Sequence, residues 1–175
     1  MKNLIALISL SIALLIPNFG AAETEVEGLK WYTSLDEAHT VSQKSNKPIF
    51  GFFTGSDWCG WCIKLQKEVF AKAAFVTWAK ENVVLFELDF PRRTPQSDEL
   101  KAQNQSLQQA FQVTGYPTIW VFTTVKDEAT QQYNLTAWGK LGYPAGAVAG
   151  KEEEKFLKDA EVVMASNPKK AQKAN

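Results

Sequence analysis

The fold of this chain is decided by one stretch, Ile49-Phe50-Gly51-Phe52-Phe53-Thr54-Gly55-Ser56-Asp57-Trp58-Cys59-Gly60-Trp61-Cys62. Residues 49–53 show no polar alternation, which predicts a strand buried on both faces of a sheet. The polar residues 54–57 then turn the chain, and a helix follows. The stretch therefore places Cys59 at or just before the first helical turn, with Cys62 one turn further in and more deeply buried.

The segments on either side alternate between strand and helix patterns. Further strands are expected at 29–32, 83–90, 119–123 and 133–138, and the last two form a hairpin-like pair before a glycine-rich link, 139–150. Strands joined through helices must pair in parallel, whereas a hairpin adds an antiparallel edge. The order β-α-β-α-β-α-β-β-α predicts an α/β fold with a mixed central sheet flanked by helices on both faces.

Apolar spacing assigns to each helix the face that packs on the sheet. The first helix begins at a capping box, Ser34 with Glu37 three residues on, and must end before Pro48. The last helix is expected at 152–165. The predicted inward faces are Leu35, Ala38 and Val41 or Ser42; Leu65, Val69, Ala73 and Val76; Leu100, Leu107 and Phe111; and Phe156, Leu157, Ala160, Val163 and Met164.

Residues 1–22 have the layout of a cleavable secretory signal. Lys2 precedes an apolar run, 4–16, and small residues end at Ala22. An uncleaved membrane anchor is the alternative, but a span needs about 20 apolar residues and this run is shorter. We therefore expect export to the periplasm, with the signal removed after about Ala22.

The remainder is long enough for one domain, 23–165, followed by a lysine-rich tail, 166–175, that we expect to be disordered. The chain has 19 basic and 19 acidic residues, and cleavage would remove only Lys2, so the mature net charge is −1. Near-neutrality gives no electrostatic reason to expect nucleic acid or an anionic membrane surface as a partner.

The cysteine pair is better suited to chemistry than to stability. Cys59 and Cys62 close a ring of four residues, for which chain entropy gives about 2 kcal/mol, against about 4.7 kcal/mol for a 100-residue loop. Free N–H groups and the positive dipole end at a helix start favour a thiolate. These arguments make Cys59 the attacking thiol and Cys62 the resolving thiol, with a purely structural disulfide as the alternative.

Metal binding is constrained by the scarcity of ligands. The chain has two cysteines and one histidine, His39, so cysteine and histidine alone cannot close a four-ligand zinc site. A two-thiolate copper(I) carrier, or another non-catalytic thiol-binding module, stays open because soft sulfur ligands suffice for copper(I). We expect His39 to be a partly exposed helix residue, and no cofactor or metal beyond the redox-active disulfide.

The motif Trp58-Cys59-Gly60-Trp61-Cys62 after an apolar strand, with Gly115-Tyr116-Pro117-Thr118 later in the chain, resembles the thioredoxin superfamily over residues 29–165. Phe53-Thr54-Gly55-Ser56-Asp57-Trp58-Cys59 and Leu88-Asp89-Phe90-Pro91 are most similar to small exported DsbH-like reductases. The resemblance implies the thioredoxin fold and thiol–disulfide oxidoreductase activity.

The resemblance also implies roles for single residues. Pro117 should be cis and face the disulfide, so that the backbone of Tyr116 can pair with an extended stretch of substrate. Trp58 should pack beside Cys59, and the substrate-binding surface should comprise Trp58, Gly60, Trp61, Tyr116 and Pro117. The alternatives are an ordinary trans turn at Pro117 and a plain core role for Trp58.

The dipeptide between the cysteines indicates the direction of the reaction. Strong oxidants of this family carry a histidine there, whereas Gly60 and Trp61 bring no charge to stabilise a thiolate. We therefore expect a reductant of disulfide-containing exported proteins. An exported reductant must be recharged, so the resemblance implies a membrane thiol donor of the DsbD type. We also expect the protein to be monomeric. An isomerase or oxidase of the same fold is the alternative.

One position departs from the thioredoxin pattern. Thioredoxins keep a buried aspartate six residues before the first cysteine, where it assists proton transfer from the resolving thiol, and that position here is Phe53. The candidate proton acceptors are Glu87, a carboxylate within an apolar strand, and Asp57 and Glu68, which are nearer in sequence. Glu87 could instead point to solvent at the end of the sheet.

Overall fold

A six-stranded mixed sheet forms the centre of the protein in the computed structural model, which describes residues 24–26 and 28–168. Its order is β1-β2-β4-β3-β5-β6, with β2, β4 and β3 parallel and the other neighbours antiparallel. The predicted α/β class and mixed sheet are confirmed. The strands are β1 (Thr24–Val26), β2 (Leu29–Tyr32), β3 (Ile49–Thr54), β4 (Val84–Asp89), β5 (Thr118–Lys126) and β6 (Tyr133–Leu141).

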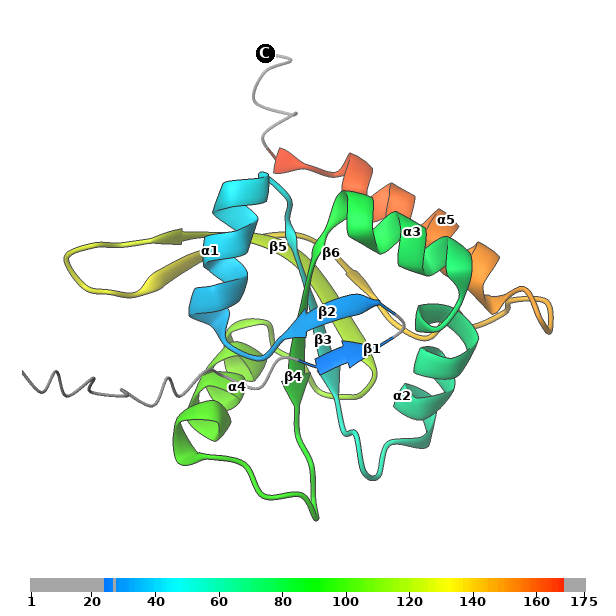
Figure 1. Cartoon of the computed structure of the whole chain (residues 1–175), viewed down its shortest axis with the longest axis horizontal. Coiled ribbons are helices and arrows are strands. Elements are labelled where there is room, and N and C mark those ends of the chain that lie inside the picture. Colours follow the sequence, from blue (N-terminus) through cyan, green and yellow to red (C-terminus); the bar gives the residue numbers. More distant parts are fainter. Residues whose placement is uncertain (1–23, 27, 169–175) are drawn as a thin grey trace, which may run out of the picture.

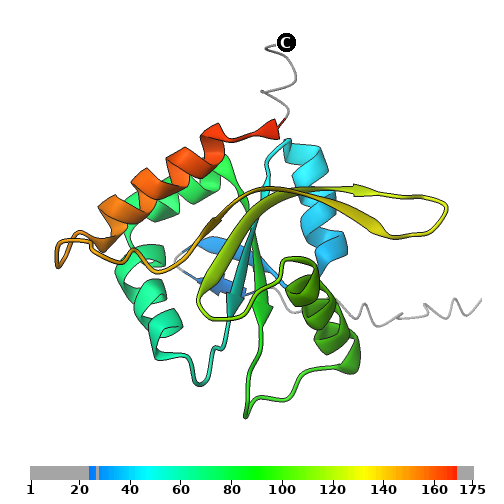
Figure 2. The same cartoon turned by 180° about the vertical axis from the view of Figure 1, so that it is seen from behind.

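Helices cover both faces of the sheet, as predicted (Figures 1 and 2). On one face, α1 (Leu35–Ser45) and α4 (Asp98–Ala110) close a core around Phe53, Phe86 and Phe122. The other face holds α2 (Gly60–Leu65), a π-helical turn η1 (Gln66–Phe70), α3 (Ala73–Asn82) and α5 (Glu152–Ala165). Both cysteines belong to this second core.

Strand β3 lies in the interior of the sheet, and all six of its residues are buried. Phe50 and Phe52 project into the core that holds the cysteines, while Ile49 and Phe53 project into the other. Burial on both faces is why the sequence shows no polar alternation here. The end of β3 leads directly into the turn that carries Cys59, so a strand buried along its whole length positions the cysteine pair.

The helix after the cysteines differs from the prediction because it is broken. Leu65 and Val69 are buried as expected, but Ala73 is exposed and Val76 only half-buried. The π turn η1 inserts an extra residue per turn and buries Phe70, after which α3 starts afresh with its own inward face. The single-face prediction is therefore wrong at Ala73, whereas Val76 packs against the same core as Leu65 and Val69.

Other differences lie at element ends. Strand β1 was not expected, and β6 continues through Gly139 to Leu141, so the link to α5 is shorter than predicted. A side chain at Gly139 would meet the Val163 methyl groups at 3.0 Å, so close packing against α5 explains a glycine inside this strand. In α4 the expected Leu100 is only partly buried, whereas Asn104 is buried.

The last helix matches its prediction, with Phe156 and Ala160 buried and Leu157, Val163 and Met164 packed against the same core. The predicted signal, 1–22, lies outside the described residues, as does the tail from residue 169. Within the described part of the chain, no helix combines the length and the apolar character that a membrane crossing requires.

Candidate active site

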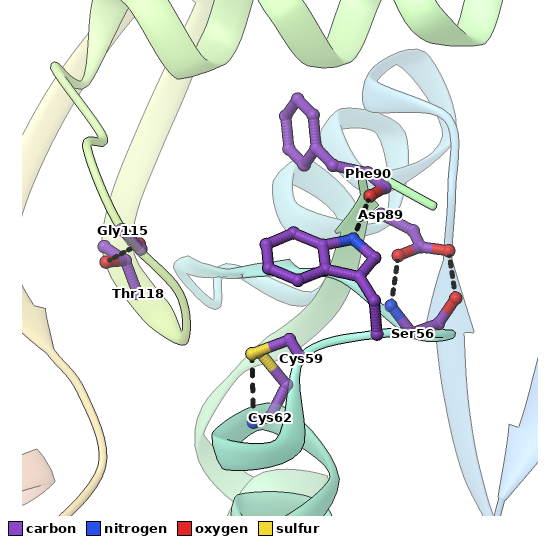
Figure 3. Close-up of a disulfide and its surroundings, with 8 residues drawn as sticks. Ser56, Cys59, Cys62, Asp89, Phe90, Gly115 and Thr118 are labelled. Carbon is purple, nitrogen blue, oxygen red and sulfur yellow. Dashed lines mark hydrogen bonds between the residues drawn. A yellow bond between two sulfur atoms is a disulfide. The ribbon is translucent and has the colours of Figure 1, made fainter. Parts of the chain in front are cut away.

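Cys59 and Cys62 form a disulfide at the start of α2, with their Cα atoms 5.3 Å apart (Figure 3). Cys59 is the N-cap residue, and its Sγ accepts the backbone N–H of Cys62 at 3.2 Å. Cys62 is fully buried, whereas Cys59 keeps 6% of its surface. An N–H that points at Sγ stabilises a thiolate. The geometry therefore favours Cys59, rather than Cys62, as the nucleophilic thiolate that is accessible to another molecule.

Trp58 lies between the disulfide and the loop after β4. Its Nε1 donates to the carbonyl of Phe90 at 2.8 Å, as the dashed line to Phe90 in Figure 3 marks, and its ring meets Tyr116 edge-on at 5.7 Å. A Cβ at Gly55 would fall 2.4 Å from the indole, so glycine is required there. Trp58 packs against the core that holds the cysteines and is only partly buried, so part of its surface stays accessible.

The turn before the disulfide is tied to the end of β4. The carboxylate of Asp89 accepts the backbone N–H of Ser56 at 2.8 Å and its hydroxyl at 2.6 Å (Figure 3). The Asp89 carbonyl in turn accepts the amide of the buried Asn104 at 3.0 Å. Helix α4 thereby helps to fix the turn, although it lies on the opposite face of the sheet.

The Tyr116–Pro117 peptide bond is cis, as the resemblance implied, and the alternative of an ordinary trans turn is wrong. The hydroxyl of Thr118 donates to the carbonyl of Gly115 at 2.7 Å and closes this turn (Figure 3). The Tyr116 hydroxyl accepts the amide of Gln108 at 2.7 Å. The predicted residues Trp58, Tyr116 and Pro117 are thus brought to one place beside the disulfide.

Trp61 projects to solvent with 58% of its surface exposed, while Gly60 is also exposed. The Trp61 ring packs at 4.9 Å against Tyr143, and the Lys64 ammonium lies 5.2 Å and 5.1 Å from the two ring centroids. Glu68 accepts the Tyr143 hydroxyl and lies 3.9 Å from Lys64. Glu68, a candidate proton acceptor, is therefore engaged in this aromatic and cationic cluster.

Asp57, the second candidate acceptor, binds the loop after β4. Its carboxylate accepts the backbone N–H groups of Arg92, Arg93 and Thr94 at 2.9, 2.7 and 3.0 Å. These bonds, led by that from Arg92, lower the pKa of Asp57 to about 2. A carboxylate this acidic is a weak base, and it serves to order the loop.

Glu87, the third candidate, pairs in register with Phe52 and lies on the sheet face that packs against both cysteines. It is partly buried and lines a cavity of about 320 Å³ with Phe52, Ile63 and Gln66, so it does not simply point to solvent. Burial, with a smaller contribution from the charge of Asp89, raises its pKa to about 7. The shift is opposite to that of Asp57, whose pKa is lowered.

Several residues that shape the site carry no signal in the sequence. Gln108 and Tyr143 come from a helix and a loop, and only tertiary packing brings them to Tyr116 and Trp61. Arg92 belongs to a loop that looks merely polar, yet its guanidinium lies 3.9 Å from the Trp58 ring centroid. No spacing rule links positions so far apart in the chain.

His39 lies on α1, partly exposed as predicted, and its Nδ1 is 2.7 Å from the hydroxyl of Thr124. Among the described residues, no group of three or more histidine, cysteine or acidic side chains is placed to hold a metal ion. The only arrangement here that the described residues offer for redox chemistry is the cysteine pair with its aromatic surroundings.

Comparisons with known proteins agree with this geometry. The family model for a thioredoxin-like domain matches residues 35–134. The chain is 41% identical over 115 residues to the disulfide bond reductase DsbH of Chlamydia pneumoniae, covering 66% of this chain and 68% of that protein. It is 27% identical over 140 residues to the thioredoxin-related protein DsbJ of the same organism, covering 79% of this chain and 39% of that longer protein.

Solved structures give the same result. A DsbH oxidoreductase superposes with a TM-score of 0.62 at 28% identity, covering 90% of this chain and 95% of that one. A thioredoxin from Thermus thermophilus superposes with a TM-score of 0.52 at 18% identity, covering 80% and 90% of the two chains, a likeness that concerns the fold alone.

Proposed function

This chain belongs to the thioredoxin-like domain family and is a DsbH-like thiol–disulfide oxidoreductase, and from that premise we propose that it works as a protein-disulfide reductase. The observation that carries the proposal is the disulfide at the start of α2, in which Cys59 accepts a backbone N–H while Cys62 is fully buried. The name of the relative that is 41% identical, a disulfide bond reductase, supports the direction.

The proposed reaction has two exchange steps. The Cys59 thiolate attacks one sulfur of a substrate disulfide, so that a mixed disulfide forms and the other substrate sulfur leaves as a thiolate, which takes up a proton. Cys62 then loses its proton and attacks the sulfur of Cys59, which releases the second substrate thiolate. The substrate gains two electrons, and the protein ends with its Cys59–Cys62 disulfide.

Substrate contact is assigned to the exposed residues around this pair. The backbone of Tyr116 next to the cis Pro117 would pair with an extended stretch of substrate, while Trp58 and Trp61 offer apolar contact on either side of Cys59. We further propose that the chain is exported to the periplasm, acts there as a monomer on disulfide-containing proteins, and is recharged by a membrane thiol donor. It needs no cofactor beyond its own disulfide.

The reducing direction is tested by the redox potential. Because Gly60 and Trp61 place no charge beside Cys59, the disulfide should be the stable form, with a potential nearer to about −270 mV than to about −120 mV. Equilibrating the protein against glutathione and dithiothreitol buffers, and counting free thiols, gives the value. A potential above about −150 mV would show that the protein is an oxidase instead.

Glu87 is proposed as the proton acceptor for Cys62. It faces the same core as Cys62, lines the cavity beside α2 and has a pKa of about 7, so near neutrality it is a stronger base than an ordinary carboxylate. Asp57 and Glu68, in contrast, are bound to the loop after β4 and to Tyr143. The proton would cross the cavity by way of water.

Replacing Glu87 by glutamine should slow release of substrate from the mixed disulfide by about tenfold at pH 8, because the wild-type carboxylate is ionised there. The wild-type rate should rise through pH 7, and that inflection should vanish in the variant. Stopped-flow mixing of reduced protein with a peptide disulfide measures both profiles. Glu81→Gln, at an exposed position of α3, is the control, and superimposable profiles for Glu87→Gln and Glu81→Gln would exclude the role.

A second readout follows from linkage. The pKa of Glu87 is raised in the folded state, so between about pH 4.5 and pH 7 the folded protein binds more protons than the unfolded chain. The free energy of unfolding should therefore fall as pH rises through this window, by roughly 3 kcal/mol at most, and Glu87→Gln should abolish the fall. Urea denaturation at several pH values measures it.

A further inference from the structure

Two cationic side chains lie against the two tryptophans of the cysteine motif, and we refer to Lys64 and Arg92 as the cationic pair. The Arg92 guanidinium lies over the ring of Trp58, the residue before Cys59. The Lys64 ammonium lies near the ring of Trp61, between the two cysteines in sequence. Both side chains are exposed, so each holds a positive charge next to the ring of a tryptophan that adjoins a cysteine in sequence.

The nearby carboxylates neutralise this pair only in part. Asp57 and Asp89 accept backbone and hydroxyl hydrogens of the two loops that they join. Within the described residues, Arg92 forms no ion pair. Glu68 forms an ion pair with Lys64 at 3.9 Å and also accepts the Tyr143 hydroxyl, while the Lys64 side chain stays 46% exposed. Arg92 is thus available to a ligand, and Lys64 remains accessible although Glu68 shares its charge.

The cationic pair also brackets the cis peptide. Trp58, under Arg92, contacts the ring of Tyr116. On the other side, the site of a Cβ at Gly142 lies 3.6 Å from the Pro117 carbonyl, and the next residue, Tyr143, packs under Lys64. A chain segment that pairs with the Tyr116 backbone would therefore pass between the two positive charges.

From this arrangement we propose that the preferred substrates are protein segments in which acidic side chains flank the disulfide on both sides. The inference rests on the proposed reductase function and specifies its substrates. Positive charge on both sides of a bound substrate disulfide attracts carboxylates and repels basic segments. It therefore affects the rate of association with the substrate more than the rate of disulfide exchange. The cationic pair determines specificity, whereas bond exchange stays with Cys59 and Cys62.

The test uses two synthetic peptides of equal length, each closed by one internal disulfide and identical except that glutamate or lysine flanks both cysteines. Reduced protein is mixed with each peptide, and acid-quenched samples are separated to give the second-order rate constant. Reduction of each peptide by free dithiothreitol corrects for intrinsic reactivity. After correction, the glutamate peptide should react about tenfold faster at low salt, and about 1 M sodium chloride should remove most of the difference because screening then acts within about 3 Å.

Charge reversal separates specificity from structural damage. In Lys64→Glu/Arg92→Glu the preference should invert, so that the lysine peptide reacts faster, an outcome that mere loss of structure cannot produce. Lys44→Glu/Lys158→Glu, at exposed positions on α1 and α5, changes the net charge equally and should keep the preference for glutamate.

Equal corrected rates for the two peptides in the wild-type protein would overturn the inference and leave the reductase function standing. A preference that survives in Lys64→Glu/Arg92→Glu would overturn it as well. Failure of the reduced protein to act on either peptide would contradict the proposed function, and the inference with it.

Discussion

Cys62→Ala is expected to convert the protein into a covalent trap for its substrates. Cys59 keeps its capping N–H and its access to solvent, so it can still attack a disulfide, but no second thiol remains to release the mixed disulfide. Turnover in insulin reduction should fall by a factor of about 10³ or more. Non-reducing gels of the protein incubated with oxidised insulin should show a band for the mixed disulfide, and this band should disappear after reduction with dithiothreitol.

Cys59→Ala is the matched control, since it also leaves one thiol. Its remaining sulfur belongs to Cys62, which lies within α2 and is fully buried, so we expect neither turnover nor trapping. If Cys59→Ala trapped insulin as efficiently as Cys62→Ala, the roles of the two cysteines would have to be exchanged. If neither variant formed a mixed disulfide while both stayed folded, the pair would be a binding site for another ligand rather than a centre of exchange.

The sequence predicted those parts of the fold that depend on local chemistry. A short unbroken apolar run that ends at turn residues is typical of an interior strand, and β3 is buried along its whole length. Alternation of strands and helices requires parallel pairing, and the mixed sheet follows. A thiol at a strand-to-helix turn meets free N–H groups, so the position of Cys59 was also predictable.

What escaped prediction depends on residues distant in sequence. Helical spacing assumes an even turn, and it could not anticipate the π turn η1, which exists because Phe70 gains contacts with rings from β2, β3, α3 and α5. The bonds from Asp89 to Ser56 and from Asp57 to the loop after β4 form only once the sheet brings these loops together. The sequence showed that Glu87 is a carboxylate within an apolar strand, but it could not predict the cavity that Glu87 lines.

The largest effect on stability is expected at Phe70. Its ring stacks at 4.6 Å on Phe75 and meets Trp31, Phe52 and Phe156 within 6 Å, while only 6% of the residue is exposed. Phe70→Ala should therefore lower the free energy of unfolding by about 3–5 kcal/mol, because it removes the burial and leaves a cavity. Urea denaturation of the oxidised protein measures the loss.

Two controls make the Phe70 prediction specific. Phe70→Leu, which keeps most of the apolar volume, should cost about 1 kcal/mol, and Val125→Ala, at an exposed position of β5, should change stability by less than about 0.5 kcal/mol. A loss for Phe70→Ala no greater than that for Val125→Ala would contradict the account of η1 as a turn held by aromatic packing.

The same substitution connects the core to the active site. Helix α2 continues directly into η1, so a loosened Phe70 should release the end of α2 and expose Cys62, which is fully buried in the native protein. In reduced Phe70→Ala, alkylation of Cys62 by iodoacetamide should therefore accelerate relative to alkylation of Cys59, whereas Phe70→Leu should keep the native ratio. Faster alkylation would show that aromatic packing at η1 keeps Cys62 inaccessible to external reagents, so that it reacts only with the mixed disulfide at Cys59.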